Sequence, residues 1–217
     1  MIAREEVEIT EIPSVAREIK EKLLSKPPSD TTLRLNDLVF PRKTALRRNT
    51  IDDGLNVKSD PDRMKELQRQ GFQQELYNAV RYGSRGQFKS VPVRLESMED
   101  KVNVYRDIPT ILRVPGTGDM VERDRLSIFF SHYFDRLAFE CALTNVRQGR
   151  LILYYEKLPG DKFMVYEVTF HSRNAILDEA KRRLKLLESG SSHTTLPSCP
   201  NWMARFCDFA PECGCSD

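Results

Sequence analysis

Residues 90–114 read SVPVRLESMEDKVNVYRDIPTILRV and contain three short segments with the character of strands. Apolar and polar residues alternate over 90–95 and over 101–105, and 110–114 is a short apolar run. A period of two residues is typical of strands that bury one face. This stretch therefore predicts three neighbouring strands.

The sequence on either side of these strands predicts helices and two further strands. Downstream, 126–146 predicts a helix, 150–156 and 162–171 predict two strands joined by LPGD at 158–161, and 172–188 predicts a last helix. Upstream, helices are expected over 12–26, 35–48 and 60–82, the last beginning with Asp60 and Pro61. This order predicts an α/β fold in which a central mixed sheet is flanked by helices.

The composition is that of a globular protein. Of 217 residues, 40% are hydrophobic and 30% are charged, and the net charge of +2 does not by itself require a nucleic-acid partner. No run approaches the roughly 18–20 apolar residues of a membrane span. The acidic N-terminus lacks the basic-then-apolar order of a signal peptide. We therefore expect an intracellular, cytoplasmic protein without a membrane partner.

The five cysteines are unevenly distributed. Cys141 lies within an apolar helical pattern and is interpreted as a core residue, since free cysteine packs as a small hydrophobe. The other four lie in the last nineteen residues and are candidate ligands of a metal ion or an iron–sulfur cluster: Cys199, Cys207, Cys213 and Cys215. Unliganded thiols remain the alternative.

Four segments together resemble a known family. They are LNDLVFPRK at 35–43, RQGFQQE at 69–75, HYFDRLAFECAL at 132–143 followed by RLILYY at 150–155, and CDFAPEC at 207–213. Their order and spacing resemble the CRISPR-associated RecB-like exonucleases that carry an iron–sulfur cluster, and more broadly the PD-(D/E)xK nucleases of RecB type. The resemblance implies a RecB-like nuclease fold, DNA as a partner and a [4Fe-4S] cluster, with zinc as the alternative metal.

The resemblance also divides the chain into three parts. We expect an N-terminal helical segment at 1–30, a nuclease-fold domain at 31–190 and a cysteine-rich segment at 191–217. Phe40 replaces the family's early cysteine, so the fourth thiolate of a cluster would come from Cys199 or Cys215.

The chain departs from the family where the catalytic metal should bind. Such nucleases use an Asp and a Glu/Asp-x-Lys on the next strand to hold a divalent cation and orient water. The strand at 110–114 has Arg113 but no carboxylate, and no upstream acid among Glu96, Glu99 and Asp100 is clearly placed. The family's His position holds Gln73 or Gln74, and the helix that should begin with Gln holds Asp135 and Arg136. These departures favour a nuclease fold whose metal site has eroded.

Displaced acids are the alternative to an eroded site. Asp119 resembles a motif Asp, and Asp161 with Glu167 resembles Asp…Glu-x-Lys with Thr169 in place of Lys. If these residues are catalytic, the protein is an active Mg²⁺- or Mn²⁺-dependent DNA exonuclease or endonuclease. Acids at a turn or on an exposed strand face are otherwise ordinary solvated residues.

Two groups of basic residues could follow a nucleic-acid backbone, because phosphate contacts by Lys and Arg do not depend on base sequence. They are Arg42, Lys43, Arg47 and Arg48, and Arg81, Arg85 and Lys89. A third run, Lys181, Arg182, Arg183 and Lys185, is better explained as a solvated helix face.

Three functions follow as hypotheses. The first is a DNA-binding, catalytically degenerate protein that acts as a scaffold or adaptor on DNA ends or single strands, with protein partners in a nucleic-acid complex. The second is an active nuclease. The third is a cluster-bearing protein-interaction module without a role in DNA binding.

Overall fold

The computed structural model describes residues 32–49, 60–116, 119–160, 162–199, 203, 207 and 209–213. The expected N-terminal helical segment at 1–30, with its helix at 12–26, lies outside the described residues. Among the described residues, no helix is long and apolar enough to cross a membrane.

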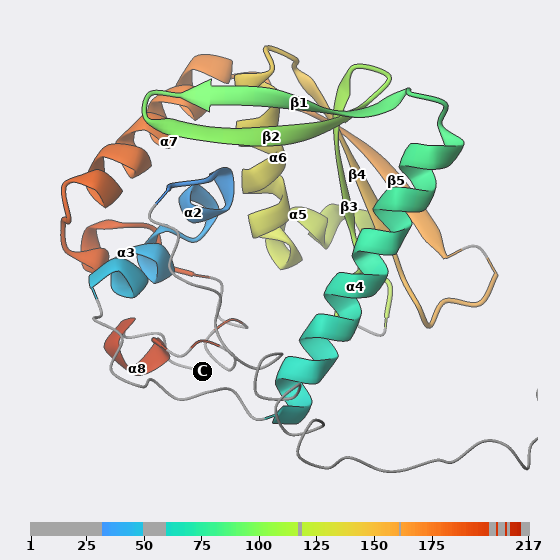
Figure 1. Cartoon of the computed structure of the whole chain (residues 1–217), viewed down its shortest axis with the longest axis horizontal. Coiled ribbons are helices and arrows are strands. Elements are labelled where there is room, and N and C mark those ends of the chain that lie inside the picture. Colours follow the sequence, from blue (N-terminus) through green and yellow to red (C-terminus); the bar gives the residue numbers. More distant parts are fainter. Residues whose placement is uncertain are drawn as a thin grey trace, which may run out of the picture.

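A five-stranded sheet forms the centre of the molecule (Figure 1). Its strands, in spatial as well as chain order, are β1 (Phe88–Leu95), β2 (Met98–Tyr105), β3 (Ile108–Arg113), β4 (Gln148–Tyr154) and β5 (Phe163–Thr169). All neighbours pair antiparallel except β3 and β4, which are parallel. The expected class, an α/β fold with a central mixed sheet flanked by helices, is confirmed.

The parallel pair requires a long connection, which contains helix α6 (Ser131–Leu143). The segment before α6 holds a 3₁₀ turn, η2 (Arg123–Arg125), and the short helix α5 (Leu126–Phe129). The single helix expected over 126–146 is therefore divided. Phe130 leaves the helical region at φ −116° and ψ 35° and is buried, and Asn145 at φ 59° follows the end of α6.

The helix expected over 35–48 is also divided, into α2 (Leu35–Val39) and α3 (Pro41–Asn49). Phe40 separates them at φ −120° and ψ 58°. The ring of Pro41 disfavours a helical conformation of the residue before it, whereas proline is well tolerated as the first residue of a helix. Pro41 marks the break in the sequence, and the prediction of one continuous helix over 35–48 was wrong.

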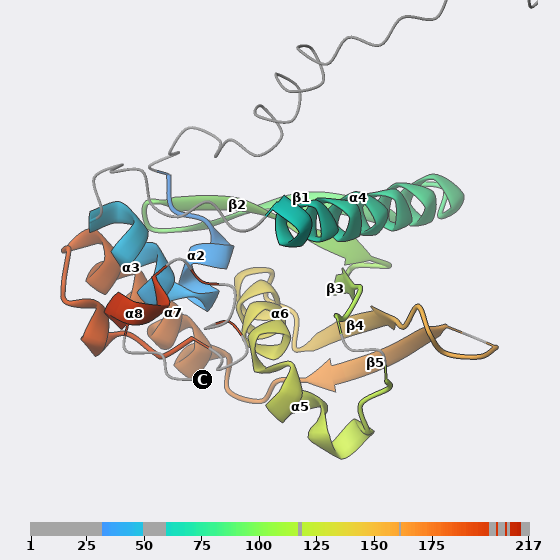
Figure 2. The same ribbon diagram turned by 90° about the horizontal axis from the view of Figure 1, so that it is seen from below.

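The remaining helices lie on both sides of the sheet. The long α4 (Asp60–Gly83) was correctly predicted and crosses one face, while α6 lies on the other (Figure 2). The helix α7 (Arg173–Glu188) packs beside α6, α2 and α3. The chain then passes through the turn η3 (His193–Thr195) to the short α8 (Ala210–Cys213), which packs against α3.

Helix α6 takes part in two hydrophobic clusters at once. Phe139 packs in the cluster formed by α2, β1, β2 and α7. Leu137 and Cys141 pack in the cluster formed by β3, β4 and α5. Cys141 is 1% exposed, which confirms its predicted core position. Burial raises the pKa of its thiol to about 12.

The approach of α6 to β4 depends on the absence of a side chain at Gly149. A Cβ atom there would lie 2.6 Å from Cγ of Leu137 and 2.7 Å from Sγ of Cys141. We therefore expect Gly149→Ala to lower the free energy of unfolding by about 1–3 kcal/mol through overpacking, measured by urea denaturation.

Gly71→Ala is the matched control. A Cβ atom at Gly71 in α4 meets no atom within 4 Å. In an exposed helix interior alanine is favoured over glycine by about 1 kcal/mol, so this variant should be neutral or slightly more stable. A Gly149→Ala protein as stable as the parent would contradict the close packing of α6 on β4.

Candidate functional site

The strands β2 and β3 separate soon after the turn that joins them. Their pairing covers only Val104↔Pro109 and Tyr105↔Ile108, after which β3 pairs with β4 instead. A cavity of about 290 Å³, here called the notch, is lined by residues of both strands and their neighbours. The lining residues are Gln74, Tyr77, Asn78 and Arg81 of α4, Phe88, Ser90, Asn103, Thr110, Ile111 and Arg113 of the sheet, and Arg136 and Glu140 of α6.

The notch gathers positions at which the chain departs from the nuclease pattern. Gln74 is one of the two candidates for the His position in the resemblance, Arg113 ends the strand where the resemblance would place Glu-x-Lys, and Arg136 lies on the helix where it would place Gln. These three residues are far apart in sequence and line one cavity in the fold. The three positions that the resemblance singles out therefore lie together in the fold.

The charge of the notch is mainly positive. Three guanidinium groups line it, those of Arg81, Arg113 and Arg136, against one carboxyl group, that of Glu140. With every group ionised, three positive charges and one negative charge leave a net charge of +2 on the lining. This balance opposes a divalent cation and favours an anion.

Arg113 is held in place by its neighbours. Its Nη1 donates to the carbonyl oxygen of Leu112 at 2.9 Å and to the hydroxyl of Tyr77 at 3.3 Å. Its guanidinium carbon lies 5.6 Å from the centre of the Tyr133 ring. The Tyr77 hydroxyl also accepts the Leu112 amide at 2.8 Å, so α4 is fixed to β3 at the notch.

Glu140 is the buried acid of the notch. Its side chain is 4% exposed, and its Oε1 accepts Nε of Arg136 at 2.8 Å, one helical turn away. Its Oε2 is buried without a hydrogen-bond partner among the described residues. Burial raises the pKa of Glu140, while Arg136 and Arg113 act in the opposite direction. A buried polar oxygen without a partner costs free energy.

Asp119 and Glu167, the two candidate catalytic acids that the structure describes, do not line the notch. Asp119 is exposed on the loop after β3. Glu167 is on β5, where its half-exposed carboxylate binds Nη2 of Arg150 at 2.6 Å. Asp161 is outside the described residues. In the part of the chain that the structure describes, no three His, Cys, Asp or Glu side chains are grouped so as to hold a metal ion.

The upstream acids Glu99 and Asp100 make local contacts, and the charge of Asp100 also helps to raise the pKa of Glu140. Glu99 pairs with Arg94 at 3.3 Å across the β1–β2 hairpin. Asp100 accepts the backbone amides of Leu35 at 3.0 Å and Lys101 at 2.7 Å. Both acids stabilise local structure where the resemblance would place a metal ligand.

In the first basic run, at 42–48, two of the four cations are bound to other parts of the protein. Arg42 donates to the carbonyl oxygen of Leu196 at 2.9 Å, and Arg47 binds Asp37 at 3.0 Å. Asp37 is buried and also accepts the hydroxyl of Thr44 and the amide of Arg34, so it ties α2 to α3. Of the predicted cations, Arg48 is exposed and Lys43 is half-buried.

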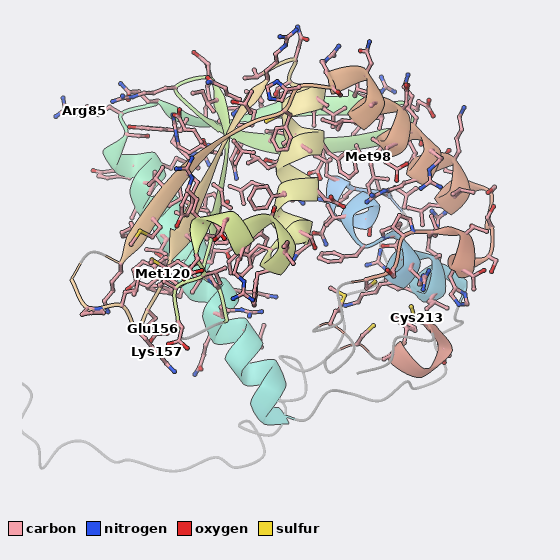
Figure 3. All side chains as sticks on the ribbon, turned by 180° about the vertical axis from the view of Figure 1, so that it is seen from behind. Arg85, Met98, Met120, Glu156, Lys157 and Cys213 are labelled. Atoms are coloured by element: carbon pink, nitrogen blue, oxygen red, sulfur yellow. The ribbon has the colours of Figure 1, made fainter. Side chains whose placement is uncertain are left out.

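The second basic run lies at the end of α4. Arg81 and Arg85 are exposed, while Lys89 pairs with Asp107 at 2.9 Å. Figure 3 shows Arg85 at the edge of the molecule, at the opposite end from Cys213. Since Arg81 also lines the notch, this run leads from the surface into the cavity.

Two arginines of the basic run on α7, Arg182 and Arg183, make hydrogen bonds within the protein. Glu179 accepts hydrogen bonds from Arg182 and Arg183, which lower its pKa to about 2. Arg183 is buried and also donates to the carbonyl oxygen of Leu38 at 2.8 Å. This agrees with the interpretation of α7 as a structural and solvated face.

Two of the tail cysteines share one cluster. Cys207 and Cys213 pack with Leu46 and Phe209 where α8 meets α3 (Figure 3). Cys199 is buried, and Cys215 lies outside the described residues. No disulfide joins the four cysteines that the structure describes.

Comparisons with known proteins place the architecture among solved folds. The structure titled "Crystal structure of SSO0001" is similar over 94% of this chain and 96% of its own, with a TM-score of 0.55 and 13% identity. A phage related exonuclease from Haemophilus somnus 129PT is similar over 81% of this chain and 92% of its own, with a TM-score of 0.46 and 12% identity. No family model and no curated protein matches the sequence. At this level of identity the first likeness concerns the fold alone.

We expect Tyr77→Phe to destabilise the protein and to loosen Arg113. The change removes the acceptor of the buried Leu112 amide, which should cost about 1–3 kcal/mol in the free energy of unfolding. Tyr82→Phe is the control, since Tyr82 is 92% exposed and its hydroxyl is hydrated in both the folded and the unfolded protein, so removing it should change stability little. Equal stability of the two variants in urea would show that Tyr77 does not fix α4 to β3.

Proposed function

We propose that this chain is a DNA-binding protein built on a nuclease-type fold, in which an arginine-lined notch replaces the catalytic metal centre. The main support is the lining of the notch, which contains three arginines and one carboxyl group. That carboxyl group, of Glu140, already binds Arg136. On this proposal the chain binds DNA ends or single strands and acts as a scaffold or adaptor in a nucleic-acid complex with protein partners.

The proposal rests on what metal-dependent cleavage requires. Two carboxylates must hold the cation while a positive group stabilises charge at the scissile phosphate. Glu140 is the one carboxyl group of the notch lining, and Arg113 and Arg136 lie beside it. A guanidinium group cannot ligate Mg²⁺ or accept a proton near neutral pH. Arginines can nevertheless bind phosphate oxygens directly, in bidentate geometry.

The cysteine tail supports a second element of the proposal, a [4Fe-4S] cluster. Cys207 and Cys213 share a hydrophobic cluster that would shield a cofactor from solvent, and Cys199 is buried. On this proposal these three and Cys215 would supply the four thiolates of a cluster local to the tail. Cys199, Cys207 and Cys213 are not grouped so as to hold a metal ion in the described structure, so the tail would have to rearrange around the cluster. Zinc is the alternative, because four thiolates also complete a tetrahedral zinc site.

DNA binding without cleavage is the expected result for the purified protein. Labelled single- and double-stranded oligonucleotides should bind with an affinity that falls as salt is raised, and should stay intact in Mg²⁺ or Mn²⁺. Replacing both Arg81 and Arg85 by Gln should weaken binding and reduce the salt slope by about 1–2. Arg182→Gln, on α7, is the control and should leave both quantities unchanged.

Cleavage would contradict the degenerate site. If it occurs and disappears in Glu167→Ala or Asp119→Ala, the protein is an active nuclease with displaced acids. If no oligonucleotide binds at low salt, the DNA-binding function is overturned, and retained function in a larger assembly would then establish the cluster-bearing protein-interaction module.

The cofactor is tested on protein purified without oxygen. We expect bound iron with a broad visible absorption band, lost when Cys213 or Cys199 is replaced by Ser. Cys141→Ala is the matched control, because that thiol is buried in the core and its pKa is about 12. Stoichiometric zinc, or no metal, would overturn the iron–sulfur assignment.

A further inference from the structure

The end of α4 carries the most exposed tyrosine or phenylalanine side chain among the described residues. Tyr82, in the last turn of this helix, is 92% exposed, whereas the exposed phenylalanines Phe72, Phe129 and Phe163 are 40–44% exposed. Tyr82 belongs to none of the hydrophobic clusters that the described residues form. Its ring therefore presents its faces to the surroundings of the protein.

The residues around Tyr82 are polar and leave room for a ligand. Arg81 and Arg85, on either side of it along the chain, are exposed. A Cβ atom at Gly83 or at Gly86 would meet no atom within 4 Å, so the space beside the backbone is open there. A single aromatic ring among cations differs from an apolar docking patch, which needs contiguous apolar surface. It is the arrangement that binds single-stranded nucleic acids, where a ring stacks on a base and cations follow the backbone.

Positive charge dominates this end of the sheet. From residue 76 to residue 93 the chain carries three cations, Arg81, Arg85 and Lys89, and no acid. The amide of Arg106 donates to the carbonyl oxygen of Gln87 at 3.0 Å, which places Arg106 at the same end. Asp107 is the acid next to it and pairs with Lys89. Four positive charges and one negative charge leave a net charge of +3, which attracts a polyanion.

The turn after α4 holds the cations near Tyr82. Ser84 fixes the turn, because its hydroxyl donates to the carbonyl oxygen of Arg81 and accepts the amide of Phe88, each at 3.0 Å. Arg85 adopts φ 49°, in the left-handed region that arginine rarely occupies. Nε of Arg106 donates to the side-chain oxygen of Gln87 at 3.0 Å, and this neutral partner leaves the charge of Arg106 uncompensated. The helix dipole of α4 accounts for a cation such as Arg81 but not for Arg106, which follows a strand.

We infer that Tyr82 stacks on an unpaired base of single-stranded DNA, while Arg81, Arg85 and Arg106 contact the neighbouring phosphates. This inference rests on the proposed DNA-binding function and names the residue that favours single strands over duplexes. Each base within a duplex is already stacked between its neighbours, so it has no face to offer to Tyr82. Since Arg81 also lines the notch, a strand bound at Tyr82 leads to the notch.

The test separates the contact to the base from the contacts to the phosphates. Labelled oligothymidine, an abasic strand of equal length and a duplex are titrated with the full-length protein by fluorescence anisotropy at one salt concentration. Tyr82→Ala should weaken oligothymidine binding about fivefold or more, because stacking on one base contributes roughly 1–3 kcal/mol. Binding of the abasic strand and of the duplex should change little. Arg85→Gln and Arg106→Gln should weaken all three ligands and each reduce the salt slope by about 1.

Aromatic replacements and a matched control distinguish stacking from a loss of structure. Tyr82→Trp should bind oligothymidine at least as tightly as the parent, and its fluorescence should be quenched on binding. The parent has one tryptophan, Trp202, so the difference between the two proteins reports on position 82. Phe129→Ala is the control, because Phe129 is also exposed and has the guanidinium of Arg125 at 4.9 Å from its ring centre, but lies on α5. This variant should bind every ligand as the parent does.

The outcomes separate this inference from the proposed function. If Tyr82→Ala binds oligothymidine as the parent does, or loses duplex binding to the same extent, the stacking role is overturned while salt-dependent DNA binding stands. If the parent binds none of the three ligands, the DNA-binding function is itself overturned. Tighter binding of oligouridine than of oligothymidine, with the same dependence on Tyr82, would keep the stacking contact and overturn its assignment to DNA.

Discussion

The packing of α6 against the sheet is the constraint on which the rest of the structure depends. The helix connects the parallel strands β3 and β4, and its side chains enter both hydrophobic clusters. It can lie this close to β4 because Gly149 has no side chain where Leu137 and Cys141 meet the strand. Both clusters are therefore organised by one helix of thirteen residues.

The same packing determines which face of α6 reaches the notch. Residues 137 and 141 face β3 and β4, so residues 136 and 140, each one position earlier, are turned toward the point where β2 and β3 separate. Arg136 and Glu140 are one helical turn apart and bind each other there. Burying an ion pair costs desolvation free energy, so the pair of Arg136 and Glu140 is weak evidence for a stabilising role.

Two regions of the protein carry separate chemistry. The notch lies among α4, the sheet and α6, whereas the cysteines pack where α8 meets α3. Between them, Asp37 joins α2 to α3, and Arg183 joins α7 to α2 through Leu38. These buried charge contacts give the cysteine-bearing end a defined position relative to the sheet. A cofactor at the tail would therefore act on the fold at a distance from the notch.

The sequence by itself determined the fold class, because alternation along strands and helical spacing depend only on neighbouring residues. It located α4, the three first strands and the core position of Cys141 within a few residues. It missed the breaks at Phe40 and Phe130, where a following proline or burial in a distant cluster overrides the helical pattern.

The site itself was decided by the tertiary structure. The sequence marked Arg113, Gln73 or Gln74, and the pair Asp135 and Arg136 as departures from a nuclease pattern. That Gln74, Arg113 and Arg136 meet at one cavity follows from the separation of β2 and β3. It gave no signal for Tyr77 and Asn103, and only the spacing of four residues between Arg136 and Glu140 pointed to their pairing. Whether a cation supports the structure or faces a ligand depends on its three-dimensional neighbours. For that reason Arg47 and Arg183 proved to be held by acids, and Arg81 and Arg113 line the notch.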